Sequence, residues 1–294
     1  MELIIYAIHI NATDIHFIND ETKCLVKLRI DNNLVTYEEI TKSFYGQLVL
    51  FIKYKSNMNL NLSKSPQSNT LSLIIEKRNL HFRVSTLPSY DSNSIVLRIN
   101  HYHFTKKVSD LLLNKEKEKL FSLLESEIGL VLITGPTCSG KTTLSYCLLQ
   151  QLKNENLAIV SIEDPIEYFE TGFVQLQVNE QAGVNYETGV KEILRHDPDV
   201  IFIGEIRDKY TARCAIRASL TGHRVITTMH ATSPIKAIYR LIELGISPFE
   251  IEQTLLLVTN QRLVQIEKSK KITLEYLTDK QIKAIITNIS RVIE

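Results

Sequence analysis

One nine-residue stretch, GPTCSGKTT at positions 135–143, constrains the fold more than any other part of the chain. It fits the pattern G-x-x-x-x-G-K-[ST], in which glycines let successive backbone N–H groups face one anion. An apolar run, LVLIT at 130–134, precedes it, and apolar residues at helical spacing follow at 142–153. Strand, glycine-rich loop and helix in this order predict a phosphate-binding loop, or P-loop. Its expected members are Gly135, Pro136, Thr137, Cys138, Ser139, Gly140, Lys141, Thr142 and Thr143.

Two side chains of this loop have predicted chemical roles. We expect the ammonium group of Lys141 to reach the β- and γ-phosphates, and the hydroxyl of Thr142 to bind Mg²⁺. The alternative is a chance match in a loop rich in glycine and serine, but the flanking strand and helix meet the condition that the motif needs. ATP and Mg²⁺ are therefore the expected cofactors.

The chain after this loop alternates between strand-like and helix-like segments. Strands are expected at 157–162, 199–204 and 224–229, and helices at 186–196, 208–222 and 234–245. The alternation predicts an α/β fold, a RecA-like P-loop NTPase domain with a mostly parallel sheet and helices on both faces. Ligands of such sheets bind beyond the carboxyl ends of the strands.

The first hundred residues have a different pattern. Gly46 is the only glycine before residue 129, so the chemistry that brings backbone close to phosphate is expected in the second part. Strand-like segments occupy 23–31, 71–86 and 94–99, and the polar segment 56–70 is expected to be a loop.

These differences predict two domains. A small α+β domain of PAS-like type is expected over 1–102, followed by a linker near 100–107. A helix at 115–127 is expected to open the ATPase domain, which would span 103–294.

Acidic residues follow two of the expected strands. Glu205 comes directly after VIFIG, the place of a Walker B carboxylate that holds Mg²⁺ or orients the attacking water. Glu163 and Asp164 end the strand at 157–162, and one of them could serve as general base. The alternatives are a strand-end acid that faces solvent and a charged turn.

Two histidines flank the strand expected at 224–229. His230 ends the strand and could donate a hydrogen bond to the γ-phosphate, and His223 precedes it. A lone histidine is more often structural.

Composition narrows the classes of function and cellular location that the chain could have. The net charge of +1 and the absence of a basic stripe with interleaved aromatics argue against direct nucleic-acid binding. The chain has no secretory signal and no run of 18 apolar residues, so membrane association is expected only through a partner. The four cysteines form no C-x-x-C pair, which indicates reduced, cytosolic thiols.

The motifs GPTCSGKTT, SIEDPIEY, LRHDPDVIFIGEIRD and TGHRVITTMHATS occur in this order. They resemble the Walker A, Asp box, Walker B and His box of the secretion ATPase superfamily, which drives type II secretion, type IV pili and competence pseudopili. ATDIHF, FRVSTLPS and IVLRI are similar to its N-terminal domain, and the segment 241–264 to its C-terminal helices. The resemblance extends from about residue 3 to 265.

The resemblance implies roles for individual residues. It implicates Glu163 in activating water, Glu205 in Mg²⁺ binding and catalysis, and His230 in the His box. It also implies that Arg83 and Arg98 approach bound nucleotide in trans or across the domain cleft. Without the resemblance, both arginines would be expected to face water at a strand edge.

The sequence also departs from the family pattern. No tetracysteine insert follows QRLV, so no zinc is expected, and the segment SYDSNS lacks the usual Gly-Glu pair, which puts the loop at 90–94 in doubt. The chain is most similar to the competence pseudopilus assembly ATPases of Gram-positive bacteria, and next to the pilus retraction ATPases.

The similarity implies a cytoplasmic homo-hexameric motor, peripheral at the inner membrane through a platform protein. The alternatives are a retraction ATPase, a RecA-like nucleic-acid motor and a nucleotide-gated scaffold with little turnover.

Overall fold

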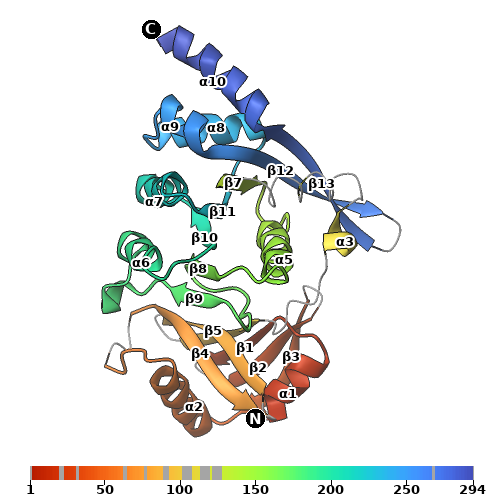
Figure 1. Ribbon diagram of the computed structural model, residues 1–294. Helices are drawn as coiled ribbons and strands as arrows, with labels where there is room; N and C mark the ends of the chain where they lie inside the picture. The colour runs from red at the N-terminus through yellow and green to blue at the C-terminus, as the bar shows by residue number, and fades with distance from the viewer. Residues whose placement is uncertain are drawn as a thin grey trace. The chain divides into compact units, whose positions relative to one another are not determined.

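Two units make up the chain, Met1–Tyr102 and His103–Glu294 (Figure 1). The structure, a computed structural model, describes residues 2–19, 23–30, 33–61, 65–75, 78–88, 93–100, 108–112, 120, 128–266 and 269–293. The linker and the helix expected at 115–127 lie almost entirely outside these residues, and so does most of the loop at 90–94.

The N-terminal unit is a six-stranded antiparallel sheet in the order β3-β2-β1-β6-β5-β4, with two helices. This is an α+β arrangement; its PAS-like character stays a prediction. The elements are α1 (Glu2–His9), β1 (Asp14–Asn19), β2 (Cys24–Ile30), β3 (Asn33–Ile40), α2 (Lys42–Lys55), β4 (Gln67–Ile75), β5 (Arg78–Pro88) and β6 (Asn93–Asn100).

Alternation along these strands separates the two faces of the sheet. Phe82 and Val84 of β5 are buried in a core that includes Ala7 of α1 and Ile52 of α2. Arg83, between the two core residues, lies on the opposite, open face because successive strand side chains point to opposite sides.

The prediction of a polar loop over 56–70 is wrong at its C-terminal end. Residues 67–70 begin β4, where Gln67 pairs with Thr86 and Thr70 with Arg83. Backbone pairing with β5 gives these polar residues a strand conformation that their composition does not favour. The single strand-like segment at 71–86 is in fact parts of two strands, β4 and β5, which pair as a hairpin.

The C-terminal unit contains a seven-stranded sheet in the order β13-β12-β7-β11-β10-β8-β9. All neighbours in this sheet are parallel except β12 and β13. The strands are β7 (Gly129–Thr134), β8 (Ile159–Glu163), β9 (Val174–Gln177), β10 (Val200–Ile206), β11 (Arg224–Met229), β12 (Leu255–Ile266) and β13 (Ser269–Thr278).

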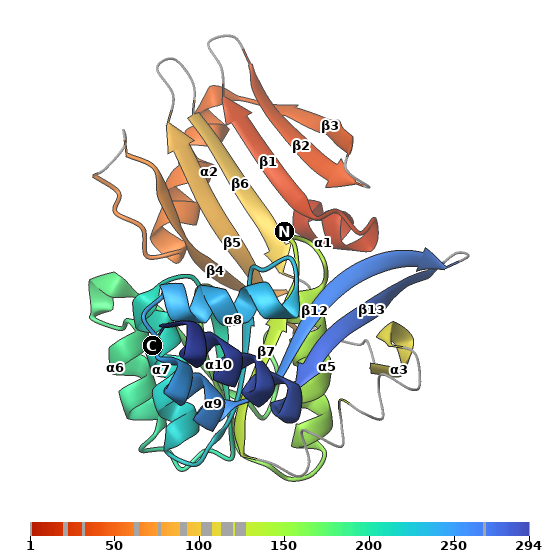
Figure 2. The same ribbon diagram turned by 90° about the horizontal axis from the view of Figure 1, so that it is seen from above.

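Helices cover both faces of this sheet, as Figure 2 shows from a second direction. One core contains residues of the helices α6 (Tyr186–Ile193), α7 (Lys209–Leu220), α8 (Pro234–Glu243), α9 (Pro248–Thr254) and α10 (Asp279–Ile293). The core on the other face contains residues of α3 (Val108–Leu111) and α5 (Lys141–Lys153). A mostly parallel α/β sheet, the expected fold class, is confirmed. None of the helices in the described part of the chain is long and apolar enough to cross a bilayer.

The segment 241–264, similar to the family's C-terminal helices, is helical only as far as Thr254. The remainder forms β12, which runs beside β7 and pairs Val258 with Leu132. The apolar run LLLV suits a helix or a buried strand equally well, and the open edge of β7 decides in favour of the strand.

Candidate functional site

The candidate site lies at one edge of the parallel sheet, where four strands end. The P-loop follows β7, Glu163 ends β8, Glu205 lies near the end of β10 and His230 follows β11. Because these strands are parallel neighbours, their carboxyl ends meet at the same edge. His223 precedes β11 and is therefore at the opposite edge, where its ring contacts Thr221.

The P-loop backbone requires glycine at its two ends. At Gly135 (φ +154°), an added Cβ would lie 2.6 Å from the carbonyl oxygen of Gln261. Gly140 has φ +85° and caps the start of α5 in the left-handed region. Cys138, between them, also has positive φ (+60°), is exposed and holds a free thiol. Thr142 and Thr143 lie half-buried in the first turn of α5.

Lys141 curls back over the loop. Its Nζ donates hydrogen bonds to the carbonyl oxygens of Gly135 (3.1 Å) and Pro136 (3.0 Å). Burial lowers the pKa of this ammonium group, against an opposing effect of Glu205. An ammonium group held on neutral carbonyls is available to a bound anion, which would satisfy it better.

Strand β12 supports the loop, a contact that the sequence did not predict. Gln261, fully buried, donates a hydrogen bond from Nε2 to the carbonyl oxygen of Ser139. Its neighbour Asn260 donates from Nδ2 to Ala231 O (2.9 Å) and Thr134 Oγ1 (3.1 Å). One strand thus links the P-loop, the end of β7 and the turn after β11. Both residues belong to NQRLV, a segment noted for its family likeness without a role.

A chain of charged and polar contacts leaves the P-loop through His230. Its Nδ1 lies 3.4 Å from Lys141 Nζ, and its Nε2 lies 2.7 Å from Glu205 Oε1. The other oxygen of Glu205 accepts a hydrogen bond from Arg207 Nε at 2.7 Å, and Arg207 Nη1 lies 3.6 Å from Asp164 Oδ2. The side chains predicted from three motifs are therefore in contact, and Arg207, quoted in GEIRD but given no role, completes the chain.

The sequence predicted that Glu205 follows the strand VIFIG. In the structure Glu205 lies inside β10, which extends to Ile206. The register with β11 shifts between Ile203 and Glu205, so Gly204 is an extra residue in the strand. Ile203 and Ile206 both enter the same core despite their odd spacing. The bulge consequently turns Glu205 away from that core, and 18% of its side chain is exposed.

Glu163 occupies a buried polar network. Its carboxylate accepts hydrogen bonds from Tyr146 Oη at 2.8 and 2.9 Å and from Ser161 Oγ at 2.7 Å. Gln175 of β9 donates to Tyr146 Oη at 3.0 Å. Burial raises the pKa of Glu163 to about 7, although these hydrogen bonds act to lower it. A carboxyl group with this pKa can gain and lose a proton near neutral pH.

Hydroxyl and carboxylate oxygens are the ligands that Mg²⁺ prefers, so Thr142 and Glu205 fit this ion chemically. Within the described ranges, no cluster of three or more His, Cys, Asp or Glu side chains could hold a metal ion. Mg²⁺ is usually bound by one or two protein groups together with substrate phosphates, which suits so small a donor set.

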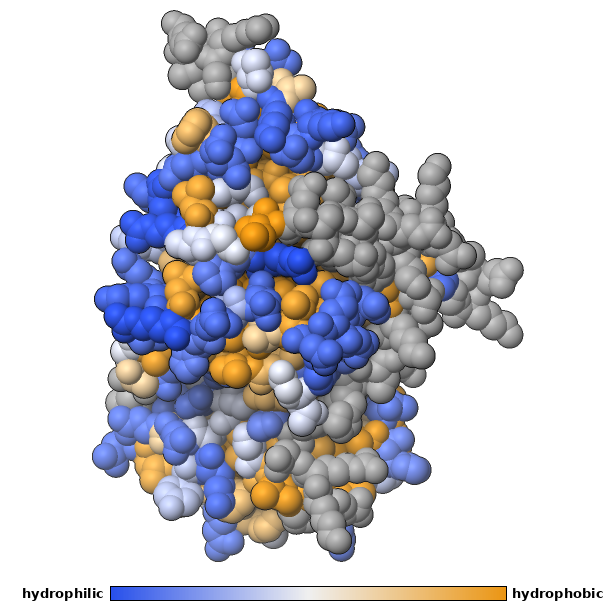
Figure 3. All heavy atoms as spheres, in the orientation of Figure 1, coloured by the Kyte–Doolittle hydropathy of each residue, from blue (hydrophilic) through white to orange (hydrophobic). Residues whose placement is uncertain are grey.

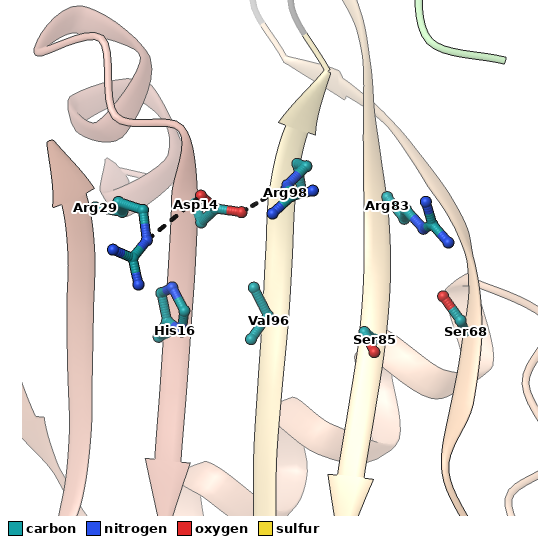
Figure 4. A pocket seen from close by; sticks show the side chains of 8 residues that line it. All are labelled: Asp14, His16, Arg29, Ser68, Arg83, Ser85, Val96 and Arg98. Carbon is teal, nitrogen blue, oxygen red and sulfur yellow. Dashed lines mark hydrogen bonds and ion pairs between the residues drawn. The ribbon is translucent and has the colours of Figure 1, made fainter. Parts of the chain in front are cut away.

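Arg83 and Arg98 belong to the N-terminal unit, where they face each other across β5 and β6. They line a pocket of about 470 Å³ on the open face of its sheet (Figure 4). Asp14 contacts Arg98 (2.8 Å) and Arg29 (3.8 Å). Burial acts to raise the pKa of Asp14, but hydrogen bonds from Arg98 and Thr13 outweigh it and the pKa is lowered. The approach of these arginines to a nucleotide stays a prediction.

Comparison with known proteins gives one consistent result. A family model described as type II/IV secretion system protein matches residues 1–290. The chain is 41% identical to competence protein ComGA of Bacillus subtilis over 257 residues, 87% of this chain and 72% of that protein. It is 39% identical to type II secretion system protein E of Pseudomonas aeruginosa over 88% of this chain, but spans only 52% of that protein.

Solved structures share the fold over nearly the whole chain. The crystal structure of the pilus retraction motor PilT with bound ADP matches 99% of this chain and 88% of that one, with TM-score 0.81 and 25% identity. The ATPase DotB of Legionella pneumophila matches with TM-score 0.75 and 24% identity, over 99% of this chain and 86% of that one.

Proposed function

Since the chain belongs to the type II/IV secretion system protein family and shares its fold with crystallised ATPases, we propose that it is a Mg²⁺-dependent motor ATPase that powers assembly of a competence pilus or pseudopilus. The observation that carries the proposal is the contact chain from Lys141 through His230 to Glu205 at the P-loop. This chain connects Lys141, which would hold the γ-phosphate, to the carboxylate of Glu205, which could hold Mg²⁺ or orient the attacking water.

Nucleotide would bind through the P-loop. Its phosphates would replace the carbonyls of Gly135 and Pro136 as acceptors for Lys141, and backbone N–H groups of the loop would donate to them. Thr142 and Glu205 would hold Mg²⁺, which neutralises charge that develops on the phosphate oxygens.

The other polar side chains of the site would orient the reactants and accept a proton. Glu205 and His230 would orient water or phosphate near Lys141, a role supported by the contacts of His230 with Lys141 and with Glu205. Glu163, with a pKa of about 7, could accept a proton when turnover exposes its buried carboxylate. Arg83 and Arg98 would add positive charge from the N-terminal unit of the same or a neighbouring subunit.

The likeness to two competence proteins supports an assembly role. The chain matches ComGA of Bacillus subtilis and that of Halalkalibacterium halodurans at 41% and 36% identity, over 72% and 76% of their lengths. We further propose that the motor is a homo-hexamer in the cytoplasm, held at the membrane by a platform protein. Retraction remains the second candidate because the pilus retraction motor PilT shares the fold.

Purified protein tests the ATPase. We expect Lys141→Ala to lose ATP binding by calorimetry, and Glu205→Gln to keep binding but release phosphate at least about tenfold more slowly. Removal of Mg²⁺ should abolish release by the parent. Glu192→Gln, which alters an exposed ion pair with Arg195, is the matched control and should be fully active. ATP binding without turnover in the parent would support a nucleotide-gated scaffold instead.

A gene deletion tests the biological role. Loss of both DNA uptake and surface pili, not restored by Lys141→Ala, is the result expected of an assembly motor. Pili that form but do not shorten would identify a retraction motor. Salt-dependent binding of single-stranded DNA by the purified protein would favour a nucleic-acid motor.

A further inference from the structure

The outward side of helix α2 is unusually apolar. The helix packs on the sheet of the N-terminal unit through Tyr45 and Ile52, which are buried. The side turned to solvent carries four large apolar or aromatic residues. Their exposed fractions are 53% for Phe44, 56% for Leu50, 49% for Phe51 and 67% for Tyr54.

These residues occupy the positions where a surface helix normally carries charge. Spacings of three, four and three residues bring Phe44, Gln47, Phe51 and Tyr54 into one row, with Leu50 beside it. No charged residue interrupts this row. Figure 3, which draws one face of the molecule, shows apolar side chains exposed among polar ones on the N-terminal unit.

The charged residues of α2 are all lysines. Lys42 and Lys55 are exposed, whereas Lys53 is only 7% exposed. Residues 40–75 contain four lysines and no aspartate or glutamate, although the whole chain has 33 acidic residues. The apolar row is therefore set in a basic segment within a protein whose net charge is only +1.

We propose that the outward side of α2 docks directly on a lipid bilayer that contains anionic headgroups. An amphipathic helix with aromatic and aliphatic residues on one side and lysines beside them binds at the boundary of headgroups and acyl chains. The exposed Lys42 and Lys55 are attracted to anionic lipid, and the apolar row loses its contact with water. The docking is separate from ATP hydrolysis, and it requires no platform protein.

The same charges argue against a second copy of the chain as the occupant. Pairing two α2 helices through this row would bring the lysines of both copies close together, and like charges repel.

The absence of tryptophan from the chain provides a direct test. Phe51→Trp introduces a single indole in the row. We expect its emission to shift to shorter wavelength when vesicles of phosphatidylglycerol and phosphatidylcholine are added, and much less with phosphatidylcholine alone. Added salt should weaken the binding.

Co-sedimentation with the same vesicles tests the surface. Phe51→Ser combined with Tyr54→Ser should reduce partitioning of the full chain at least about tenfold, since two apolar anchors are lost. Ile74→Ser is the matched control. Ile74 is 72% exposed. Its neighbour Ile75 points into the core beneath α2, so Ile74 lies on the opposite side of the sheet from α2. This control should partition like the parent, and all proteins should keep their unfolding midpoint and ATP binding.

Three results would overturn the proposal. The first is no binding of the parent to anionic vesicles, and the second is equal binding by the double variant. The third is concentration-dependent association of the parent in sedimentation velocity without lipid, lost in the double variant, which would make α2 an interface between copies. If the parent does not hydrolyse ATP, the proposed function is contradicted, but the lipid result can still be interpreted.

Discussion

At the scale of single residues, the carboxyl group of Glu163 should be the most sensitive to pH. It is 2% exposed, and burial raises its pKa from 4.5 to about 7. The groups that face it are the hydroxyls of Tyr146 and Ser161 and the side-chain amide of Gln175, with the carboxylate of Glu167 acting at longer range. Each hydroxyl favours the ionised form, and the negative charge of Glu167 opposes it.

We predict that ATP hydrolysis rises with pH through about 7, because only the ionised carboxylate can accept a proton. Tyr146→Phe removes a donor to both oxygens of Glu163, so it should raise that pKa and move the rise to higher pH. The measurement is phosphate release between pH 5.5 and 9. An unchanged profile in this variant, with full activity, would contradict a role for Glu163 as base.

The same shift has a consequence for stability. Glu163 binds its proton more tightly in the folded protein than in the unfolded one. Its contribution to the unfolding free energy is therefore fully present below pH 4.5 and is lost as pH rises through about 7. The loss amounts to about 3 kcal/mol for a shift of this size. Relative to Glu163→Gln, the parent should therefore lose unfolding free energy between pH 5 and 8 in urea titrations. A constant difference between the two proteins would exclude the raised pKa.

Cys138 offers a probe of the P-loop. Of the four free thiols it is the exposed one, since Cys24, Cys147 and Cys214 are buried. Burial also raises the pKa of Cys214 to about 11, which reduces its reactivity further. We expect N-ethylmaleimide to modify Cys138 first, as read by mass spectrometry, and to abolish ATP binding by filling the phosphate site.

Bound ATP should protect this thiol. Cys138→Gly is the control, because glycine accepts φ +60° without strain and should bind ATP before and after the reagent. Modification that leaves ATP binding intact would place the nucleotide elsewhere.

At the scale of elements, β12 connects the parts of the site. Asn260, 2% exposed, links the end of β7 to the turn that follows His230. We predict that Asn260→Ala costs about 1–3 kcal/mol of unfolding free energy, because it leaves a part-buried carbonyl and a buried hydroxyl without this donor. ATP hydrolysis should fall as well, since the turn after His230 loses its support. Urea titration and phosphate release measure the two effects.

The control for this variant is Asn154→Ala, at the exposed end of α5. A surface change there should stay within about 0.5 kcal/mol of the parent. Equal effects of both substitutions would mean that Asn260 has no special place in the element.

Sequence patterns predicted those elements whose local signals agree. β7, the P-loop and α5 follow one another with buried apolar residues before the loop and glycines within it, and all three lie as expected. The patterns did not predict β12, because LLLV is ambiguous until the edge of β7 is known. They also gave no role to Gln261, whose contact with Ser139 spans more than a hundred residues.

The candidate site was predictable where a motif named the residue. Lys141, Glu205 and His230 come from separate motifs, and their contacts follow from the parallel order of β7, β10 and β11. Arg207 was not singled out because a charged residue after a strand has no distinctive spacing. The burial of Glu163 depends on Tyr146 of α5, which no local pattern indicates.

At the scale of the whole molecule, the N-terminal unit presents two adjacent arginines on the open face of its sheet. Arg98 is held by Asp14, whereas Arg83 is exposed in the neighbouring strand. We predict that Arg83→Ala slows ATP hydrolysis at least about tenfold in assembled rings, because an arginine supplied in trans stabilises the transferring phosphoryl group. Turnover measured across the concentration range of assembly tests this.

The control is Arg195→Ala, which removes an exposed arginine paired with Glu192 one turn away. It should leave turnover unchanged at every concentration. If Arg83→Ala slows dilute subunits as much as rings, the arginine does not act between subunits.

The bulge in β10 shows that the residue types of a motif do not by themselves fix where its side chains point. Ile203 and Ile206 are three positions apart and share a core only because the bulge takes Gly204 out of the alternation, and the carboxylate of Glu205 is presented at the sheet edge for the same reason. If the strand paired regularly through these residues, every motif letter would stay the same and Glu205 would point to the side of Ile203, into the core. The position of the charge is thus encoded by the register of the strand as well as by the residue itself.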